Sequence, residues 1–218
     1  MLVDSKRSVF KDYMGTQRKI RYEAGEPTAD AIWTRTWLPQ LYTDNKKRIL
    51  ILGDAVTEGM SFYYEELLGA EWSVHRQTGS APVTSELYLA RLRFALTAAR
   101  KKYDVICLTT PVFGDEAPND YGKALHRAAD MIKEYQPQAR VILVAHTMAD
   151  VAAVGKNTNI RIYGYNRALE VLAVETGAEF VDLGVISERL SGDRAENGVV
   201  FTDAGYKKFA FEVVKKIK

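Results

Sequence analysis

Short apolar runs, some of them without polar alternation, restrict the fold of this chain more than any other feature. They follow the first 46 residues, at positions 49–52, 72–75, 105–109, 141–145 and 179–183. Such runs are typical of strands that are buried on both faces of a sheet. Between them lie segments with helical spacing, such as Leu125, Ala128 and Ile132, which share one helical face. Strands that alternate with helices predict βαβ units and a parallel sheet covered by helices on both faces.

Residues 1–46 have a different character, because they contain aromatic side chains but no buried-strand run. The pattern predicts one short helix around 29–38, which Pro39 would end. We expect an N-terminal arm, residues 1–46, on which Trp33 and Trp37 pack against a main domain formed by residues 47–218. A platform for a ligand and a contact between two copies of the chain are the alternatives for these tryptophans.

The composition excludes several classes of protein. The 218 residues carry 30 Lys and Arg against 28 Asp and Glu, so the net charge is +2, without the basic excess of a nucleic-acid binder. Cys107 is the only cysteine, which rules out a disulfide within the chain and a Cys₂His₂ zinc site. His75, His126 and His146 lack the spacing of metal ligands, and the glycine-rich nucleotide fingerprints are absent from the sequence. We expect no metal, no organic cofactor and no nucleic-acid partner.

Two further expectations concern the surroundings of the protein. The N-terminal residues lack the apolar segment of a secretory signal, and no window approaches the roughly 18 apolar residues needed to span a bilayer. We expect a cytoplasmic protein without a membrane span. The basic run 46–48 is interpreted as the solvated start of the first strand and not as a nucleic-acid site.

Two segments carry information about function. Residues 48–59 read RILILGDAVTEG, which predicts a buried strand, a turn with glycine and the start of a helix. In open α/β sheets ligands bind at the carboxyl ends of the strands, so this turn is the natural site. Residues 197–210 read NGVVFTDAGYKKFA, a loop that enters the last helix, with Thr202 or Asp203 as its N-terminal cap.

Together the two segments resemble those of the SGNH hydrolases, also called the GDSL type, in a match that runs from Arg48 to Lys218. In that family the first block is an apolar strand followed by Gly-Asp-Ser, and the last block carries the catalytic Asp and His. Segments 103–108, 162–169 and 179–183 are similar to the family's third strand, the helix before its fifth strand, and that fifth strand. The resemblance implies a flavodoxin-like, three-layer α/β/α sandwich with a five-stranded parallel sheet, and the removal of acyl groups from sugars, lipids or small esters.

The resemblance also implies that the scaffold of both blocks is retained. The matching residues are Gly53, Asp54, Thr57, Gly59, Thr202, Gly205 and Tyr206. Asp54 would then stabilise the turn after the first strand, and Gly79 would supply an oxyanion contact. Judged by residue type alone, Thr57 is expected to cap the helix that follows the turn.

At the family's catalytic positions the sequence carries different residues. Ala55 stands at the position of the nucleophilic serine, Asn197 at that of the aspartate, Val200 at that of the histidine and Phe113 at that of the oxyanion asparagine. Alanine has no oxygen to attack an acyl carbon, and valine has no nitrogen to accept a proton. Because a triad acts as a unit, these losses together predict a catalytically inactive protein, or pseudoenzyme, of this fold.

The favoured hypothesis is a non-catalytic protein that binds a small molecule, a glycan or acyl group, or a protein partner at the former active site. The pocket is expected to include Gly53, Asp54, Ala55, Thr57, Gly79, Phe113, His146 and Val200. The sequence assigns no oligomeric state, so the partner of the arm stays open.

Two alternatives remain. The first is an active esterase or acetyltransferase with relocated residues, in which an oxygen of Thr57 or Ser61 would act with a histidine. His75 and His146 are expected at the ends of the second and fourth strands, with Asp150 or Asp115 to orient the imidazole. Each histidine has a structural interpretation too, His146 through hydrogen bonds within its loop and His75 as a satisfied residue at the strand end. The second alternative is an assembly role beside an active enzyme, for which the aromatic arm would be used.

Overall fold

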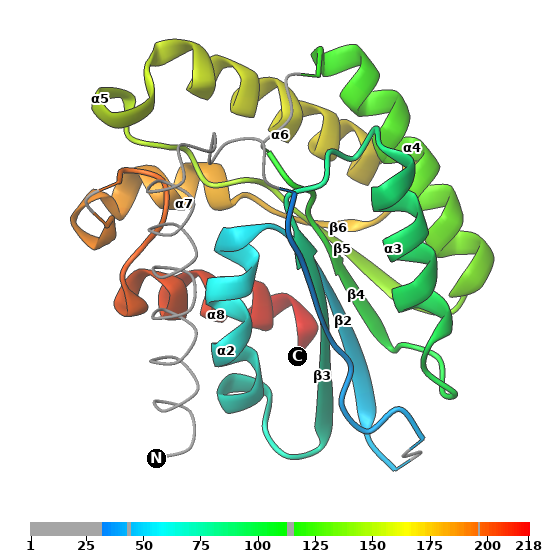
Figure 1. Ribbon diagram of the computed structural model, residues 1–218. Helices are drawn as coiled ribbons and strands as arrows, with labels where there is room; N and C mark the ends of the chain where they lie inside the picture. The colour runs from blue at the N-terminus through cyan, green and yellow to red at the C-terminus, as the bar shows by residue number, and fades with distance from the viewer. Residues whose placement is uncertain (1–31, 43–44, 113–115, 196) are drawn as a thin grey trace, which may run out of the picture. The chain divides into compact units, whose positions relative to one another are not determined.

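The computed structural model describes residues 32–42, 45–112, 116–195 and 197–218 (Figure 1). The elements below belong to one compact unit, Thr34–Lys218. Six strands form one sheet in the order β1-β3-β2-β4-β5-β6. Their bounds are Thr34–Trp37 for β1, Lys47–Gly53 for β2, Trp72–Gly79 for β3, Val105–Leu108 for β4, Arg140–Val144 for β5 and Glu179–Val181 for β6. The strands β2 to β6 are parallel, which confirms the predicted five-stranded sheet.

The sixth strand was not expected. Residues 34–37, inside the range predicted to be helical, form β1, which pairs antiparallel with β3 from Thr34 opposite Gly79 to Trp37 opposite Arg76. The helix prediction is therefore wrong for these residues, while 29–31 lie outside the described residues. The ladder with β3 decides the conformation here, helped by the β-branched Thr34 and Thr36. Residues 34–37, predicted to lie in the arm, thus belong to the sheet of the main domain.

Helices cover both faces of the sheet, as expected for a three-layer sandwich (Figure 1). Their bounds are Ala55–Leu68 for α2, Glu86–Thr97 for α3, Pro118–Tyr135 for α4, Val151–Val154 for α5, Lys156–Thr176 for α6, Leu183–Arg189 for α7 and Asp203–Ile217 for α8, with a short 3₁₀ helix at Ser191–Asp193. In β2, Ile49 and Ile51 belong to the apolar cluster with α2 and α8, whereas Leu50 and Leu52 pack with α3, α4 and α6. This two-sided burial explains the lack of alternation in the sequence.

The strand order places a topological switch point at β2. The chain passes from β2 to β3 on one side and then to β4 on the other, so both neighbours of β2 in the sheet follow it in sequence. The loops after β2 and β4 therefore leave the sheet in opposite directions, which is where open α/β sheets form their ligand crevice. Among the described residues no helix is long and apolar enough to cross a membrane.

Candidate functional site

The turn after β2 is built around a buried aspartate. Asp54 is the N-cap of α2, and its Oδ1 accepts hydrogen bonds from the backbone N–H groups of Val56 at 2.9 Å and Thr57 at 3.2 Å. The turn-stabilising role implied for Asp54 is confirmed. The expectation that Thr57 caps the helix is wrong, because Thr57 lies inside the first turn and its hydroxyl points back to Asp54 Oδ1 at 3.5 Å.

Close packing fixes the end of β2. A Cβ atom on Gly53 would lie 2.2 Å from Thr57 Oγ1 and 2.5 Å from Thr109 Cγ2, so only glycine fits where α2 and the loop after β4 converge. Along α2, a Cβ on Gly59 would lie 2.4 Å from the ring of Tyr206, which lets α2 and α8 approach closely. These contacts give a steric reason for the glycines of the two sequence blocks.

Ala55 occupies the position where the resemblance implies a nucleophile. It is the first residue of α2, it is half-buried, and its methyl group offers no oxygen. The hydroxyl of Ser61, proposed as a substitute, is fully buried and donates to the Glu58 carbonyl at 2.7 Å. Thr57 is 2% exposed. Both residues are therefore almost completely shielded from solvent.

His146 lies in the loop after β5 and is enclosed by polar partners. Hydrogen bonds join its Nε2 to the hydroxyl of Tyr121 at 3.0 Å and its Nδ1 to the hydroxyl of Thr109 at 3.3 Å. Its backbone is held by Asn166, which binds both the N–H and the carbonyl. Burial lowers the pKa of the imidazole to about 3, so the ring is neutral near pH 7. Its partners come from other elements, so the prediction of bonding within the loop is wrong.

His75 does not lie at the expected end of its strand. The strand β3 continues four residues further, to Gly79, and places His75 in its middle. The Nδ1 atom bonds with the Tyr103 hydroxyl at 3.0 Å and the Nε2 atom with the Ser73 hydroxyl at 3.2 Å. Burial lowers the pKa of this imidazole to about 4. His75 is therefore satisfied, as expected, but it is remote from the carboxyl edge of the sheet.

The second sequence segment, residues 197–210, leads into α8. Thr202 caps α8, since its hydroxyl accepts from the Gly205 N–H at 3.3 Å, which confirms one of the two predicted caps. The exposed Asn197 bonds within its own loop, where its Oδ1 accepts from the N–H groups of Val199 at 3.0 Å and Val200 at 3.1 Å. The amide at the aspartate position thus stabilises a local turn. Val200 is half-buried and brings no titratable group.

Of the remaining predicted residues, two lie among the described residues and two do not. Asp150 caps the short helix α5, with its Oδ1 accepting from the Ala152 N–H at 2.9 Å. Gly79 ends β3, where it is buried opposite Thr34 of β1. Phe113 and Asp115 lie outside the described residues, so the oxyanion position stays a prediction. In the described part of the chain no group of three or more His, Cys, Asp or Glu side chains could hold a metal ion.

Sequence reasoning missed a buried charge cluster beside the turn. Glu58, one helical turn after Asp54, is 1% exposed and accepts from Thr78 Oγ1 at 2.6 Å. The guanidinium groups of Arg35 at 3.3 Å and Arg76 at 3.4 Å neutralise it. These partners come from β1 and β3, so no spacing in the sequence could have indicated the cluster. It anchors the first turn of α2 to the edge of the sheet.

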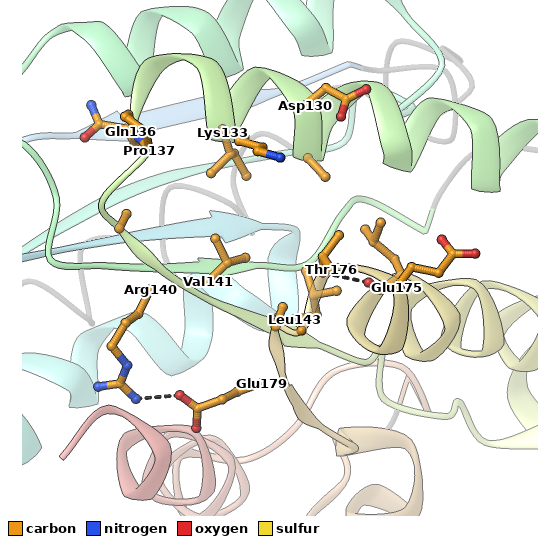
Figure 2. A pocket seen from close by; sticks show the side chains of 16 residues that line it. Asp130, Lys133, Gln136, Pro137, Arg140, Val141, Leu143, Glu175, Thr176 and Glu179 are labelled. Atoms are coloured by element: carbon orange, nitrogen blue, oxygen red, sulfur yellow. Dashed lines mark hydrogen bonds and ion pairs between the residues drawn. The ribbon is translucent and has the colours of Figure 1, made fainter.

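A pocket of about 510 Å³ opens elsewhere, between the ends of α4 and α6 (Figure 2). Ile132, Leu143 and Leu172 form part of its apolar lining, and an ion pair of 2.5 Å between Arg140 and Glu179 lies at its rim. It is located at the amino ends of β5 and β6, opposite to the turn after β2. None of the predicted site residues lines it, so it is separate from the candidate site.

Burial of Asp54 gives the site a testable electrostatic signature. Loss of solvation raises the pKa of this carboxyl from its ordinary 3.8 to about 6, against the opposing backbone hydrogen bonds of Thr57 and Val56. A raised pKa in the folded state means that the stabilising contribution is present below pH 3.8 and is lost as the pH rises through 6. The loss amounts to about 3 kcal/mol at most.

We therefore expect Asp54→Asn to stabilise the protein above pH 6 by up to about 3 kcal/mol, because asparagine keeps the cap without the buried charge. Near pH 4 the two proteins should differ little. Urea unfolding at pH 4 and pH 8 measures the difference, and Asp203→Asn, in the exposed first turn of α8, serves as the control. A difference between Asp54→Asn and the unmodified chain that does not change with pH would contradict the proposed protonation.

Comparisons with known proteins agree on the fold. No family model matches the sequence, and the search of curated proteins found no match either. Solved structures do match. The lipolytic G-D-S-L family protein from Veillonella parvula is 15% identical with a TM-score of 0.63, and the alignment covers 78% of this chain and 97% of that one.

Two further structures agree. The lipase/acylhydrolase from Enterococcus faecalis is 16% identical with a TM-score of 0.64, and the alignment covers 78% of this chain and 95% of that protein. The aryl esterase from M. smegmatis is 17% identical with a TM-score of 0.66, and the alignment covers 78% of this chain and 98% of that protein. The chain therefore has the fold of the GDSL-type lipolytic hydrolases, as the two sequence blocks predict.

Proposed function

We propose that this chain, built on the fold of the GDSL-type hydrolases, is a catalytically inactive member of that fold that acts by binding. The observation that carries the proposal is the state of the turn after β2, where Ala55 is the first residue of α2. A methyl group stands there at the helix N-terminus, and the neighbouring hydroxyls of Thr57 and Ser61 are buried. An acyl-enzyme cannot form without a nucleophilic oxygen at this place.

The positions of the aspartate and histidine in the family's triad support the same conclusion, and so does His146. The amide oxygen of Asn197 is used by two N–H groups of its own loop, and Val200 cannot accept a proton. His146, the base required by the alternative with relocated residues, has both ring nitrogens engaged and is 5% exposed. A general base must reach the proton that it removes, so this imidazole is unsuited to the role.

We propose that the ligand is a small acyl or glycan group, or a segment of a partner protein, bound at the carboxyl edge of the sheet. The scaffold of this edge is preserved: Asp54 and Thr202 cap the two helices that border it. Ala55 and Val200 are half-buried and make its surface more apolar than that of a serine hydrolase. Such a surface suits an acetyl or longer acyl group.

Hydrolysis of p-nitrophenyl acetate tests the inactive assignment. The purified chain should release p-nitrophenol no faster than a heat-denatured sample, and Ala55→Ser should not rescue it because no base is in reach. His146→Gln serves as the comparison variant. A saturable rate well above that of the denatured sample, lost in His146→Gln, would overturn the proposal in favour of an esterase with relocated residues.

Binding is tested separately by calorimetry with acetylated chitooligosaccharides and with short-chain carboxylates. We expect saturable heat with at least one of these probes, and its loss in Ala55→Trp, whose indole fills the space above the first turn of α2. Ala90→Trp, on the exposed face of α3, is the matched control and should bind like the unmodified chain. Equal heats for the unmodified chain and Ala55→Trp would exclude the carboxyl edge as the site.

A further inference from the structure

The amino ends of β2 and β4 gather basic side chains that the candidate site does not use. The loops before these strands and the first residue of β2 contribute five cations, here called the basic edge: Lys46, Lys47, Arg100, Lys101 and Lys102. Both loops lie at the lower right of Figure 1. They are tied together, because Lys101 Nζ donates to the Lys46 carbonyl at 2.7 Å and the Arg100 N–H donates to the Leu41 carbonyl at 3.2 Å.

The buried side chain of Arg48 joins the two loops of the basic edge. Arg48 is fully buried, and its guanidinium donates to the carbonyls of Lys101 at 3.0 Å and Gln40 at 2.8 Å. Two acids lie beside these six cations, Arg48 included. Asp104 accepts from the Arg48 backbone N–H at 2.7 Å, and Glu71 is an exposed acid beside Lys47. Since the whole chain is nearly balanced at 30 basic and 28 acidic residues, the excess of cations at this edge results from their placement in the fold.

Aromatic side chains accompany the cations. Tyr42, in the loop before β2, is 78% exposed, and Trp72 begins β3 with the Lys47 ammonium 5.4 Å from the centre of its ring. Tyrosine and tryptophan beside Lys and Arg are typical of the interface between water and a lipid headgroup layer.

We propose that the basic edge docks on a membrane surface rich in anionic lipid headgroups, with Tyr42 inserted at the headgroup level. Four of the five cations are lysines, which attract phosphates as flexible point charges and lack the planar fork that reads bases or clamps a nucleic-acid phosphate. This composition favours lipid headgroups over nucleic acid. The proposal is independent of the proposed function, because the basic edge lies at the end of the sheet opposite to Ala55.

Co-sedimentation with vesicles tests the proposal. The full chain should bind vesicles of phosphatidylcholine with 30 mol% phosphatidylserine and not vesicles of phosphatidylcholine alone, and the binding should fall steeply between about 50 and 500 mM NaCl. Replacing Lys47, Arg100 and Lys102 together by glutamine should weaken the partition by roughly 100-fold, at about fivefold for each charge removed. Tyr42→Ser should reduce the residual binding at high salt.

A matched variant controls for the total charge. Arg91, Lys123 and Arg167 are exposed on α3, α4 and α6, and their joint replacement by glutamine removes the same charge away from the edge. This control should bind within twofold of the unmodified chain, and circular dichroism verifies that both variants fold. No binding to anionic vesicles, or equal loss in both triple variants, would overturn the proposal. Binding of a duplex DNA or RNA oligomer in place of vesicles would overturn it too. If the edge variant fails to fold, the salt and lipid dependence of the unmodified chain decides.

Discussion

Replacement of Glu58 by alanine is expected to lower the free energy of unfolding by about 3–5 kcal/mol, one of the two largest effects in this protein. The carboxylate is 1% exposed and lies within 3.4 Å of the guanidinium nitrogens of Arg35 and Arg76. Its removal leaves the Arg76 side chain, which is 11% exposed, without its ion-pair partner, and leaves Thr78 Oγ1 without its acceptor. Urea unfolding monitored by tryptophan fluorescence measures the loss.

The same helix provides the control. Glu66 pairs with Lys207 at 2.6 Å, and both side chains are about half exposed, so Glu66→Ala should cost at most about 1 kcal/mol. A double variant, Glu58→Ala with Arg76→Leu, should recover part of the stability, because both members of the buried pair are then gone. If Glu58→Ala is no more destabilising than Glu66→Ala, the cluster does not anchor α2.

Much of the fold could be predicted because its strands are buried on both faces. Each predicted run marks one of the five parallel strands β2 to β6, and the burial of β2, β4 and β5 is already visible as nearly uninterrupted apolar sequence. The strand β1 could not be found in this way. Its residues Thr34–Trp37 are only half-buried or exposed, and pairing with β3 imposes the extended conformation on a segment whose own pattern is ambiguous.

The residues of the candidate site also differ in how far their roles could be predicted from the sequence. Asp54 and Thr202 hydrogen-bond with residues that follow them closely in sequence, so their capping roles could be anticipated. His146 could not be understood from its neighbours, because Tyr121 lies 25 positions away and Thr109 lies 37 away. Buried polar networks are assembled by tertiary structure, and a sequence shows their members without their partners.

The second large effect is expected at Arg48, the second residue of the strand β2. The sequence pattern suggested a solvated basic run, yet this side chain is fully buried while Lys47 beside it is exposed. Its guanidinium donates to the carbonyls of Gln40, Leu41 and Lys101 at 2.8, 3.1 and 3.0 Å. It thereby joins the loop before β2 to the loop before β4.

We expect Arg48→Met to lower the free energy of unfolding by about 3–5 kcal/mol. Methionine fills much of the volume, so the loss reports the carbonyls left without a donor and not a cavity. Lys47→Met, at the neighbouring exposed position, should change stability by no more than about 0.5 kcal/mol. Chemical denaturation of both variants at one pH and salt concentration measures the contrast. Equal stabilities would mean that water satisfies these carbonyls and that the two loops are held by their backbone hydrogen bonds alone.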